Sequence, residues 1–116
     1  MELKRDLVKY IRDKAKSKYK KGCECEICGD TVKLDFHHFH SLTRLLHKWV
    51  KEQGLEPYLV LEWREEFIDE HDAELYEYTA TLCHKHHLQL HSIYGKDPLL
   101  STATKQERWV RIQREK

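Results

Sequence analysis

Apolar side chains recur at helical spacing in two long stretches of the chain. Residues 3–20 are predicted to form a helix that ends before Gly22, with a single apolar stripe made of Leu3, Leu7, Val8 and Ile11. Residues 41–53 are predicted to form a second helix, in which Ser41 is the N-cap and Gly54 follows the last turn. Its apolar face consists of Leu42, Leu45, Leu46, Trp49 and Val50.

Two segments with a different pattern predict extended structure. Residues 31–39, "TVKLDFHHF", follow a turn at Gly29 and Asp30 and alternate apolar with polar side chains, which is typical of a half-buried strand. Residues 79–91, "TATLCHKHHLQLH", begin extended and are predicted to become helical near Cys83, with Gly95 as the end of that helix. Strand and helix signals therefore alternate along the chain.

Two further helices complete the predicted scaffold. One covers residues 62–69, after the apolar run "YLVLEW", and the last one begins at Ser101 or Thr102. The fold class expected from these elements is α+β. A length of 116 residues suits one domain with a modest core, so we expect a single domain over residues 1–116.

Charge is distributed unevenly along the chain, although the net charge is only +1. Residues 1–21 contain nine basic against three acidic side chains, and residues 52–77 contain ten acidic against one basic side chain. The C-terminal segment, residues 101–116, is basic again. Two basic ends therefore flank an acidic insert, which occupies residues 41–77.

No apolar run is long enough to span a bilayer, and the charged N-terminus is unlike a signal peptide. We therefore expect a cytoplasmic protein with no membrane partner. In a reducing compartment, four cysteines and nine histidines favour metal sites over disulfides.

One predicted metal site is a structural zinc. Cys25 and Cys28, followed by Gly29, have the spacing of a zinc knuckle, and Cys83 and His86 repeat that spacing at the start of a helix. Together they would form a Cys3His tetrahedron that joins the two ends of the core, residues 23–91, across the insert. Cys23 lies two residues before Cys25 and competes with it for the same register.

A second predicted metal site uses the remaining histidines. His87 and His91 lie one helical turn apart and can chelate one ion, and the pair His37 and His38 offers a third ligand. In a regular strand His37 and His38 point to opposite faces. Asp35 is either a partner that orients an imidazole or an exposed strand residue.

These motifs, taken together, resemble the HNH endonuclease family. The resemblance covers residues 25–91 and rests on the C-x-x-C-G knuckle, the apolar strand that leads into His-His, and "LC-x-x-H-H-x-x-x-H". It implies a small ββα-metal core with a zinc staple, in an enzyme that hydrolyses DNA phosphodiester bonds, as in phage or mobile-element nucleases. Nicking of one strand and cleavage of both strands stay open. Such an enzyme would act in the bacterial host cell.

The resemblance also implies roles for individual residues. His37, His87 and His91 would bind the catalytic divalent ion (Mg²⁺, Mn²⁺, Ni²⁺ or Zn²⁺), and His38 would be the general base that activates water. Without the resemblance, the residues alone do not decide between His38 and His40 as the base. Tyr78 stands where the family has an asparagine that holds the loop of the base, and the chain contains no asparagine. Tyr78 would take over that role through its hydroxyl, or the acidic side chains of Glu74 and Glu77 would.

The basic ends are the predicted contacts to DNA phosphates. The candidate residues are Lys14, Lys16, Lys18, Lys20 and Lys21 before the knuckle, and Arg108 and Arg111 in the last helix. The acidic insert is a candidate contact for a protein partner, such as another phage or mobile-element protein. Oligomeric state has no signal in the sequence.

Two other functions are compatible with the same sequence. One is a catalytically inactive, zinc-stapled module that binds nucleic acid or protein. The other is an adaptor that uses its acidic insert as the contact surface. Cleavage that depends on His38 separates the enzyme from both.

Overall fold

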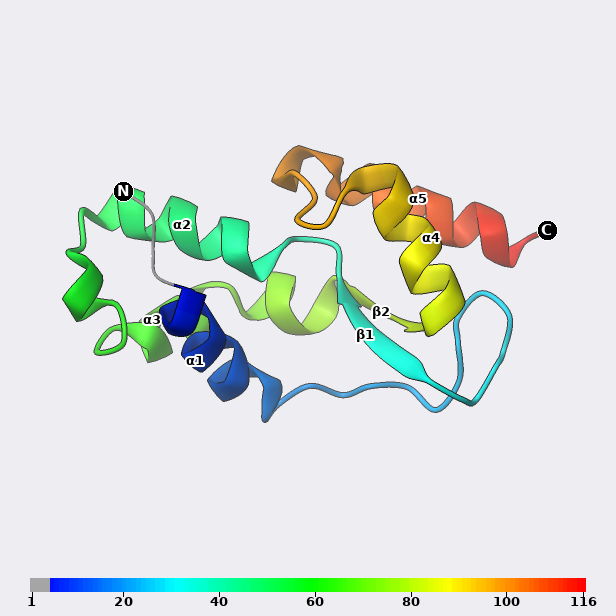
Figure 1. Cartoon of the computed structure of the whole chain (residues 1–116), viewed down its shortest axis with the longest axis horizontal. Helices are drawn as coiled ribbons and strands as arrows, with labels where there is room; N and C mark the ends of the chain where they lie inside the picture. Colours follow the sequence, from blue (N-terminus) through cyan, green and yellow to red (C-terminus); the bar gives the residue numbers. More distant parts are fainter. Residues whose placement is uncertain (1–4) are drawn as a thin grey trace.

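The computed structural model describes residues 5–116, and it contains short helices around a two-stranded sheet (Figure 1). The α+β fold class predicted from the sequence is confirmed. The elements are α1 (Arg5–Lys16), β1 (Leu34–His38), α2 (Leu42–Gln53), α3 (Arg64–Glu70), β2 (Thr79–Cys83), α4 (His84–Tyr94) and α5 (Ala103–Arg114). Single turns of 3₁₀ helix cover Pro57–Leu59 and Leu100–Thr102, and a π turn covers Ala73–Glu77.

The two strands pair antiparallel, with Leu34 opposite Cys83 and His38 opposite Thr79. The segment that leads into the cysteine knuckle runs along the other side of β2. There the Gly22 N–H donates to Thr81 Oγ1 at 2.7 Å, and the Glu26 N–H donates to the Thr81 carbonyl at 2.9 Å. β2 is therefore held between β1 and the knuckle segment.

Two separate apolar cores divide the elongated molecule, which measures 46 × 26 × 21 Å. The first core joins α1, α2 and α3 with the π turn, and we call this half the helical lobe. The second core joins the knuckle, the sheet, α4 and α5, and we call this half the metal lobe. Figure 1 shows β1 and β2 at the junction, with α1, α2 and α3 at one end and α4 and α5 at the other.

The helical lobe follows the apolar pattern of its sequence closely. The five apolar residues predicted for one face of α2 are all buried, and they pack against Val8, Ile11 and Ala15 of α1. The predicted caps are also confirmed, because Ser41 Oγ accepts the Arg44 N–H at 3.4 Å and Gly54 adopts a left-handed φ of 64°. A left-handed residue after the last turn is the usual end of a helix.

The prediction that the first helix extends to residue 20 is wrong. Helix α1 ends at Lys16, and Ser17 Oγ donates to the Lys14 carbonyl at 2.9 Å in its last turn. Tyr19 then leaves the helical path and stacks on Phe36 of β1, with ring centroids 4.7 Å apart. Packing of this aromatic ring on the sheet takes the place of another helical turn. The predicted stripe residue Leu3 lies outside the described residues.

The predicted strand is present over Leu34–His38, but its polar face is at least partly buried, as its apolar face is. Val32, an apolar residue of the predicted alternation, lies before the strand and is 62% exposed. His37, a polar residue of the same alternation, is only 3% exposed. The physical reason is that α4 and α5 cover the polar face, so this face is an internal site rather than a solvated surface.

The C-terminal elements agree with the predicted order. β2 passes directly into α4, which ends at Gly95, and α5 follows Thr102. Thr102 does not cap α5 with its side chain, because Thr102 Oγ1 donates to the Leu99 carbonyl at 2.6 Å. Within residues 5–116, no helix has both the length and the apolar character needed to cross a bilayer.

Candidate active site

The four residues predicted to bind zinc come together in the metal lobe. Cys28 Sγ lies 3.9 Å from Cys83 Sγ, and His86 Nδ1 lies 3.1 Å from Cys83 Sγ and 3.8 Å from Cys25 Sγ. A tetrahedral zinc with bonds of about 2.3 Å to sulfur needs sulfur atoms about 3.8 Å apart, so the spacing suits zinc. This cluster can hold a metal ion.

The backbone of the knuckle favours ionised sulfur. Burial acts to raise the pKa of the Cys25 thiol, but the backbone N–H groups of Cys28, Cys83 and Ile27 outweigh it and keep the pKa below its usual value. Gly29, with a φ of 75°, makes the tight turn in which its N–H donates to the Cys25 carbonyl. Cys23 is exposed and lies outside the cluster, so the knuckle uses the register of Cys25.

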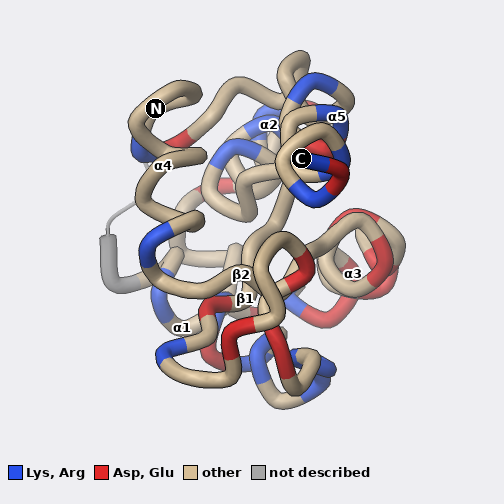
Figure 2. Tube along the Cα trace, turned by 90° about the vertical axis from the view of Figure 1, so that its right-hand side faces the viewer, with Lys and Arg blue, Asp and Glu red and all other residues tan. Residues whose placement is uncertain are grey.

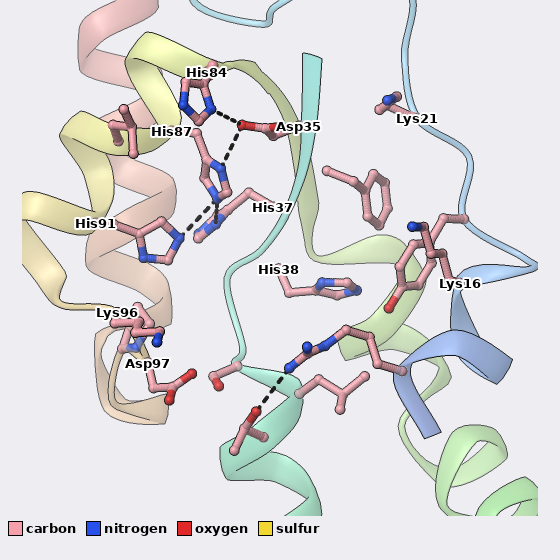
Figure 3. A pocket seen from close by; sticks show the side chains of 18 of the residues that line it. Lys16, Lys21, Asp35, His37, His38, His84, His87, His91, Lys96 and Asp97 are labelled. Atoms are coloured by element: carbon pink, nitrogen blue, oxygen red, sulfur yellow. Dashed lines mark hydrogen bonds and ion pairs between the residues drawn. The ribbon is translucent and has the colours of Figure 1, made fainter. Parts of the chain in front are cut away.

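Three histidines form a second cluster between β1 and α4 (Figure 3). His37 Nδ1 lies 3.2 Å from His87 Nε2, and His91 Nε2 lies 3.0 Å from the same atom. His87 and His91 come from one face of α4, as their spacing predicted, and His37 comes from the buried face of β1.

The outer nitrogen of each imidazole faces an oxygen acceptor. His87 Nδ1 lies 3.0 Å from Asp35 Oδ2, His91 Nδ1 lies 2.8 Å from the Gly95 carbonyl, and His37 Nε2 lies 2.8 Å from Gln106 Oε1. Each outer nitrogen therefore carries the proton, and each inner nitrogen presents a lone pair.

Three lone pairs whose nitrogens all lie within 4.8 Å of one another repel one another unless a cation lies among them. Bonds of about 2.0–2.1 Å to a metal ion place two ligand nitrogens roughly 3 Å apart, and histidine ligands usually donate their second N–H to an oxygen. The donor set and its partners thus fit a divalent metal ion.

Burial favours the neutral form of His37 and His87. It lowers the pKa of His37 to about 3, and it lowers the pKa of His87 although the hydrogen bond that His87 donates to Asp35 acts in the opposite direction. Burial acts to raise the pKa of Asp35, but hydrogen bonds with His84 and His87 hold it below its usual value. A neutral imidazole beside an ionised carboxylate is the state that binds a metal ion.

His38 points away from the three-histidine cluster, to the other side of β1, as Figure 3 shows. Its Nε2 lies 2.9 Å from the Leu75 carbonyl, and its Nδ1 makes no hydrogen bond with any described residue. Burial is the main reason that the pKa of His38 falls to about 4, so its imidazole is neutral at physiological pH.

One groove connects the two sides of β1. Its floor includes Asp35, His37 and His38, and α4 contributes His87 and His91 to one wall. The opposite wall comes from α1 and the segment after it, and its basic residues are Arg12, Lys16 and Lys21.

The predicted DNA contacts lie in four places. Lys16 and Lys21 line the groove, whereas Lys14 and Lys18 border a smaller pocket beside the acidic α3. Lys14 Nζ lies 3.9 Å from Glu65, and both side chains are largely exposed. Lys20 is exposed and lies outside the groove lining.

Arg108 and Arg111 are exposed on α5, which lines no part of the groove. Figure 2 shows blue basic positions along α5 and red acidic positions gathered on α3.

Tyr78 contributes to the loop through its backbone. Its carbonyl accepts the Phe39 N–H at 3.2 Å, and its ring is 46% exposed and lies 5.7 Å from the ring of His40. Among the described residues, the carbonyl oxygen of Leu75, and not Tyr78, makes the hydrogen bond to the imidazole of His38.

Sequence reasoning missed three neighbours of the histidines. Gln106 and Leu75 bind the imidazoles of His37 and His38, and Arg12 lies beside His38, where its charge acts to lower the pKa of that imidazole. Arg12 lies in the basic segment, residues 1–21, whose lysines were predicted to contact DNA. Its positive charge could therefore have identified it as a candidate site residue. Gln106 and Leu75 are ordinary helix residues with no signal in their spacing.

The fold and the site define the class of this protein: an α+β protein with two Cys/His clusters that can each hold a metal ion, one of them beside a basic groove. A model of the nicking endonuclease family of phage T5 matches residues 1–116. The chain therefore belongs to this family, and it is an endonuclease that acts on DNA. No solved structure matches it.

Proposed function

We propose that this protein is an HNH-type nicking endonuclease in which β1, β2 and α4 form the ββα-metal unit. The observation that carries this proposal is the convergence of three imidazole nitrogens, from His37, His87 and His91, in the groove that also contains a separate neutral histidine, His38, on the other side of β1. A divalent ion on the three nitrogens would stabilise negative charge on the scissile phosphate and on the leaving oxygen.

His38 is the general base of the proposed mechanism. Its Nδ1 accepts a proton from water as the water attacks phosphorus, and the Leu75 carbonyl holds the ring by accepting a hydrogen bond from Nε2–H. This carbonyl oxygen stabilises the positive charge that develops on the imidazole, because it accepts the hydrogen bond from Nε2–H. The expected products are a 5′-phosphate and a 3′-hydroxyl.

Asp35 and the Gly95 carbonyl keep two of the metal ligands in place. Asp35 Oδ2 accepts from both His84 Nδ1, at 3.1 Å, and His87 Nδ1, so the carboxylate fixes the ring of His87 with its Nε2 turned inward. Gly95 does the same for His91 from the end of α4. These contacts orient the ligands before substrate arrives.

The groove is the proposed path of the nicked strand. Arg12, Lys16 and Lys21 on one wall and Lys96 near the other place positive charge along the floor that carries His37 and His38. These side chains contact phosphates rather than bases, so affinity falls with salt and sequence preference is weak. Lys14, Lys18, Lys20, Arg108 and Arg111 lie outside the groove and would contact only flanking DNA.

The Cys3His cluster is the proposed structural zinc site. It joins the knuckle to the junction of β2 and α4, and so fixes the start of the helix that carries His87 and His91. Four protein ligands leave no open position for substrate, which is the usual difference between a structural and a catalytic zinc.

Plasmid cleavage tests the proposal. Zinc-loaded protein is given Mg²⁺, Mn²⁺, Ni²⁺ or Zn²⁺, and conversion of supercoiled to open-circular DNA is followed on gels. His38→Ala should lower the rate by about 10²–10⁴-fold, since general base catalysis contributes that much. His40→Ala is the matched control and should cleave at nearly the wild-type rate, because His40 does not line the groove.

Two results would contradict the proposal. Equal loss in His38→Ala and His40→Ala would mean that the base is misassigned. Absence of cleavage with every metal, in protein that still shifts DNA in a low-salt gel, would favour the inactive binding module.

A further inference from the structure

Gln106 is a buried polar residue in the apolar core of the metal lobe. Its side chain is 0% exposed, although it belongs to a basic helix, and its neighbours in α5, Ala103 and Val110, are buried apolar residues. Burying an amide is unfavourable unless its hydrogen bonds are made. The side chain therefore needs a specific set of partners.

Three hydrogen bonds fix the orientation of this amide. Gln106 Nε2 donates to the Phe39 carbonyl at 3.1 Å and lies 3.0 Å from Thr102 Oγ1. Since a carbonyl can only accept, the nitrogen of the amide must face Phe39, and the oxygen must face His37. Gln106 Oε1 then lies 2.8 Å from His37 Nε2.

This orientation decides which nitrogen of His37 carries the proton. An acceptor at Nε2 keeps the proton there and leaves Nδ1 with the lone pair that points to His87 Nε2. With the tautomer reversed, an N–H would point into the three-histidine cluster and exclude a cation.

We propose that Gln106 is the positioning residue of the metal centre: it holds His37 as the Nε2–H tautomer and so makes α5 part of the metal site. This inference rests on the proposed function, because it concerns the same three-histidine cluster. Partners of this kind commonly change metal affinity by about 10–100-fold. The C-terminal helix, outside the HNH-like segment, would thus control how tightly the enzyme binds its metal ion.

Cobalt titration of the zinc-loaded protein tests this role. Binding of Co²⁺ to the three histidines is followed by its visible absorption, in wild type and in Gln106→Met, which keeps the side-chain length but removes the acceptor. The expected result is affinity about 10–100-fold weaker in Gln106→Met, with a changed band pattern. Gln106→Glu restores an acceptor oxygen and should recover part of the affinity.

Val110→Ala is the matched control. Val110 lies on the buried face of the same helix, so this variant loosens the packing of α5 without touching His37. It should lower the melting temperature but bind Co²⁺ as wild type does. Equal weakening in Val110→Ala and Gln106→Met would show that Gln106 acts only by packing α5, and wild-type affinity in Gln106→Met would overturn the inference.

Nitrogen NMR gives a second readout that packing alone does not move. The sample is wild-type protein with zinc at the Cys3His cluster and no metal ion at the three histidines. In it His37 should show the Nε2–H tautomer, and Gln106→Met should show a mixture of tautomers. An Nδ1–H tautomer in wild type would overturn the inference. If wild type and His87→Ala give the same cobalt titration, the three-histidine metal site itself is wrong, and the proposed function fails with it.

Discussion

The helical lobe and the metal lobe differ in how much apolar surface stabilises them. Among the residues that the structure describes, twelve form the buried core of the helical lobe, including Trp49, Phe67 and three leucines from α2. The metal lobe has eight, and two of these are the metal-cluster residues Cys25 and Cys83. The free energy gained by burying apolar side chains is roughly proportional to the buried area. The metal lobe therefore gains much less of this free energy to offset the conformational entropy that it loses on folding. In the proposed function, metal ions bound at the two clusters would make up for the smaller apolar area of the metal lobe.

The proposed active site takes its parts from both lobes. The metal ligands are held within the metal lobe, by Asp35, Gly95 and Gln106, whereas the base His38 is held by Leu75, which belongs to the core of the helical lobe. Damage to the metal lobe should therefore disturb the metal ligands and leave the support of His38 intact. Damage to the helical lobe should do the reverse.

The largest expected effect is the loss of the zinc cluster. Cys83→Ser should unfold the metal lobe, because binding energy of a structural zinc is folding energy and this core is small. Hydrogen exchange read by mass spectrometry should show lost protection in α4 and α5, with protection kept in α2. Cys23→Ser is the matched control and should keep its zinc, since Cys23 lies outside the cluster. Zinc loss in both variants would contradict the register based on Cys25.

The next effect is a cavity in the helical lobe. Phe67 is fully buried and packs edge-on against Trp49, with ring centroids 5.5 Å apart. Phe67→Ala should lower the free energy of unfolding by about 3–5 kcal/mol, as deletion of a buried aromatic ring does. Denaturant unfolding measures this loss, and zinc content by metal analysis should stay unchanged. A variant that lost its zinc at the same time would show that the lobes fold as one unit.

A smaller effect concerns the walls of the groove. Replacing Lys16 and Lys21 together by alanine should remove about two phosphate contacts and reduce the slope of log K against log salt by about 1.8. Replacing Lys14 and Lys18, which border the pocket beside α3, should change the slope much less. Fluorescence anisotropy with labelled DNA at several salt concentrations measures both. Equal slopes in the two double variants would place the DNA outside the groove.

The smallest effect is expected at the start of α2. Ser41 Oγ accepts the Arg44 N–H, and Ser41→Ala should cost about 1 kcal/mol of stability, the usual value for loss of an N-cap. The melting temperature measures the loss. Cleavage should fall little at a temperature where the variant stays folded, and a large fall would mean that the α2 N-terminus contacts substrate.

Features that depend on short-range spacing could be read from the sequence. The apolar face and caps of α2, the strand that leads into His37 and His38, and the junction of β2 with α4 all follow from periods of two or 3.6 residues. The same periods place His87 and His91 on one face of α4. Both metal clusters were accessible for this reason, since most of their ligands lie within one turn of each other.

Features that join distant parts of the chain were decided by the tertiary structure. His37 meets Gln106 across 69 residues, and His38 meets Leu75 across 37. Neither pair leaves a periodic trace, because the partners are brought together by the packing of α5 and of the π turn on the sheet. The early end of α1 has the same origin in the packing of Tyr19 on Phe36. Local spacing specified which side chains belong to the two metal clusters, and packing of the two lobes decided which atoms hold these side chains in place.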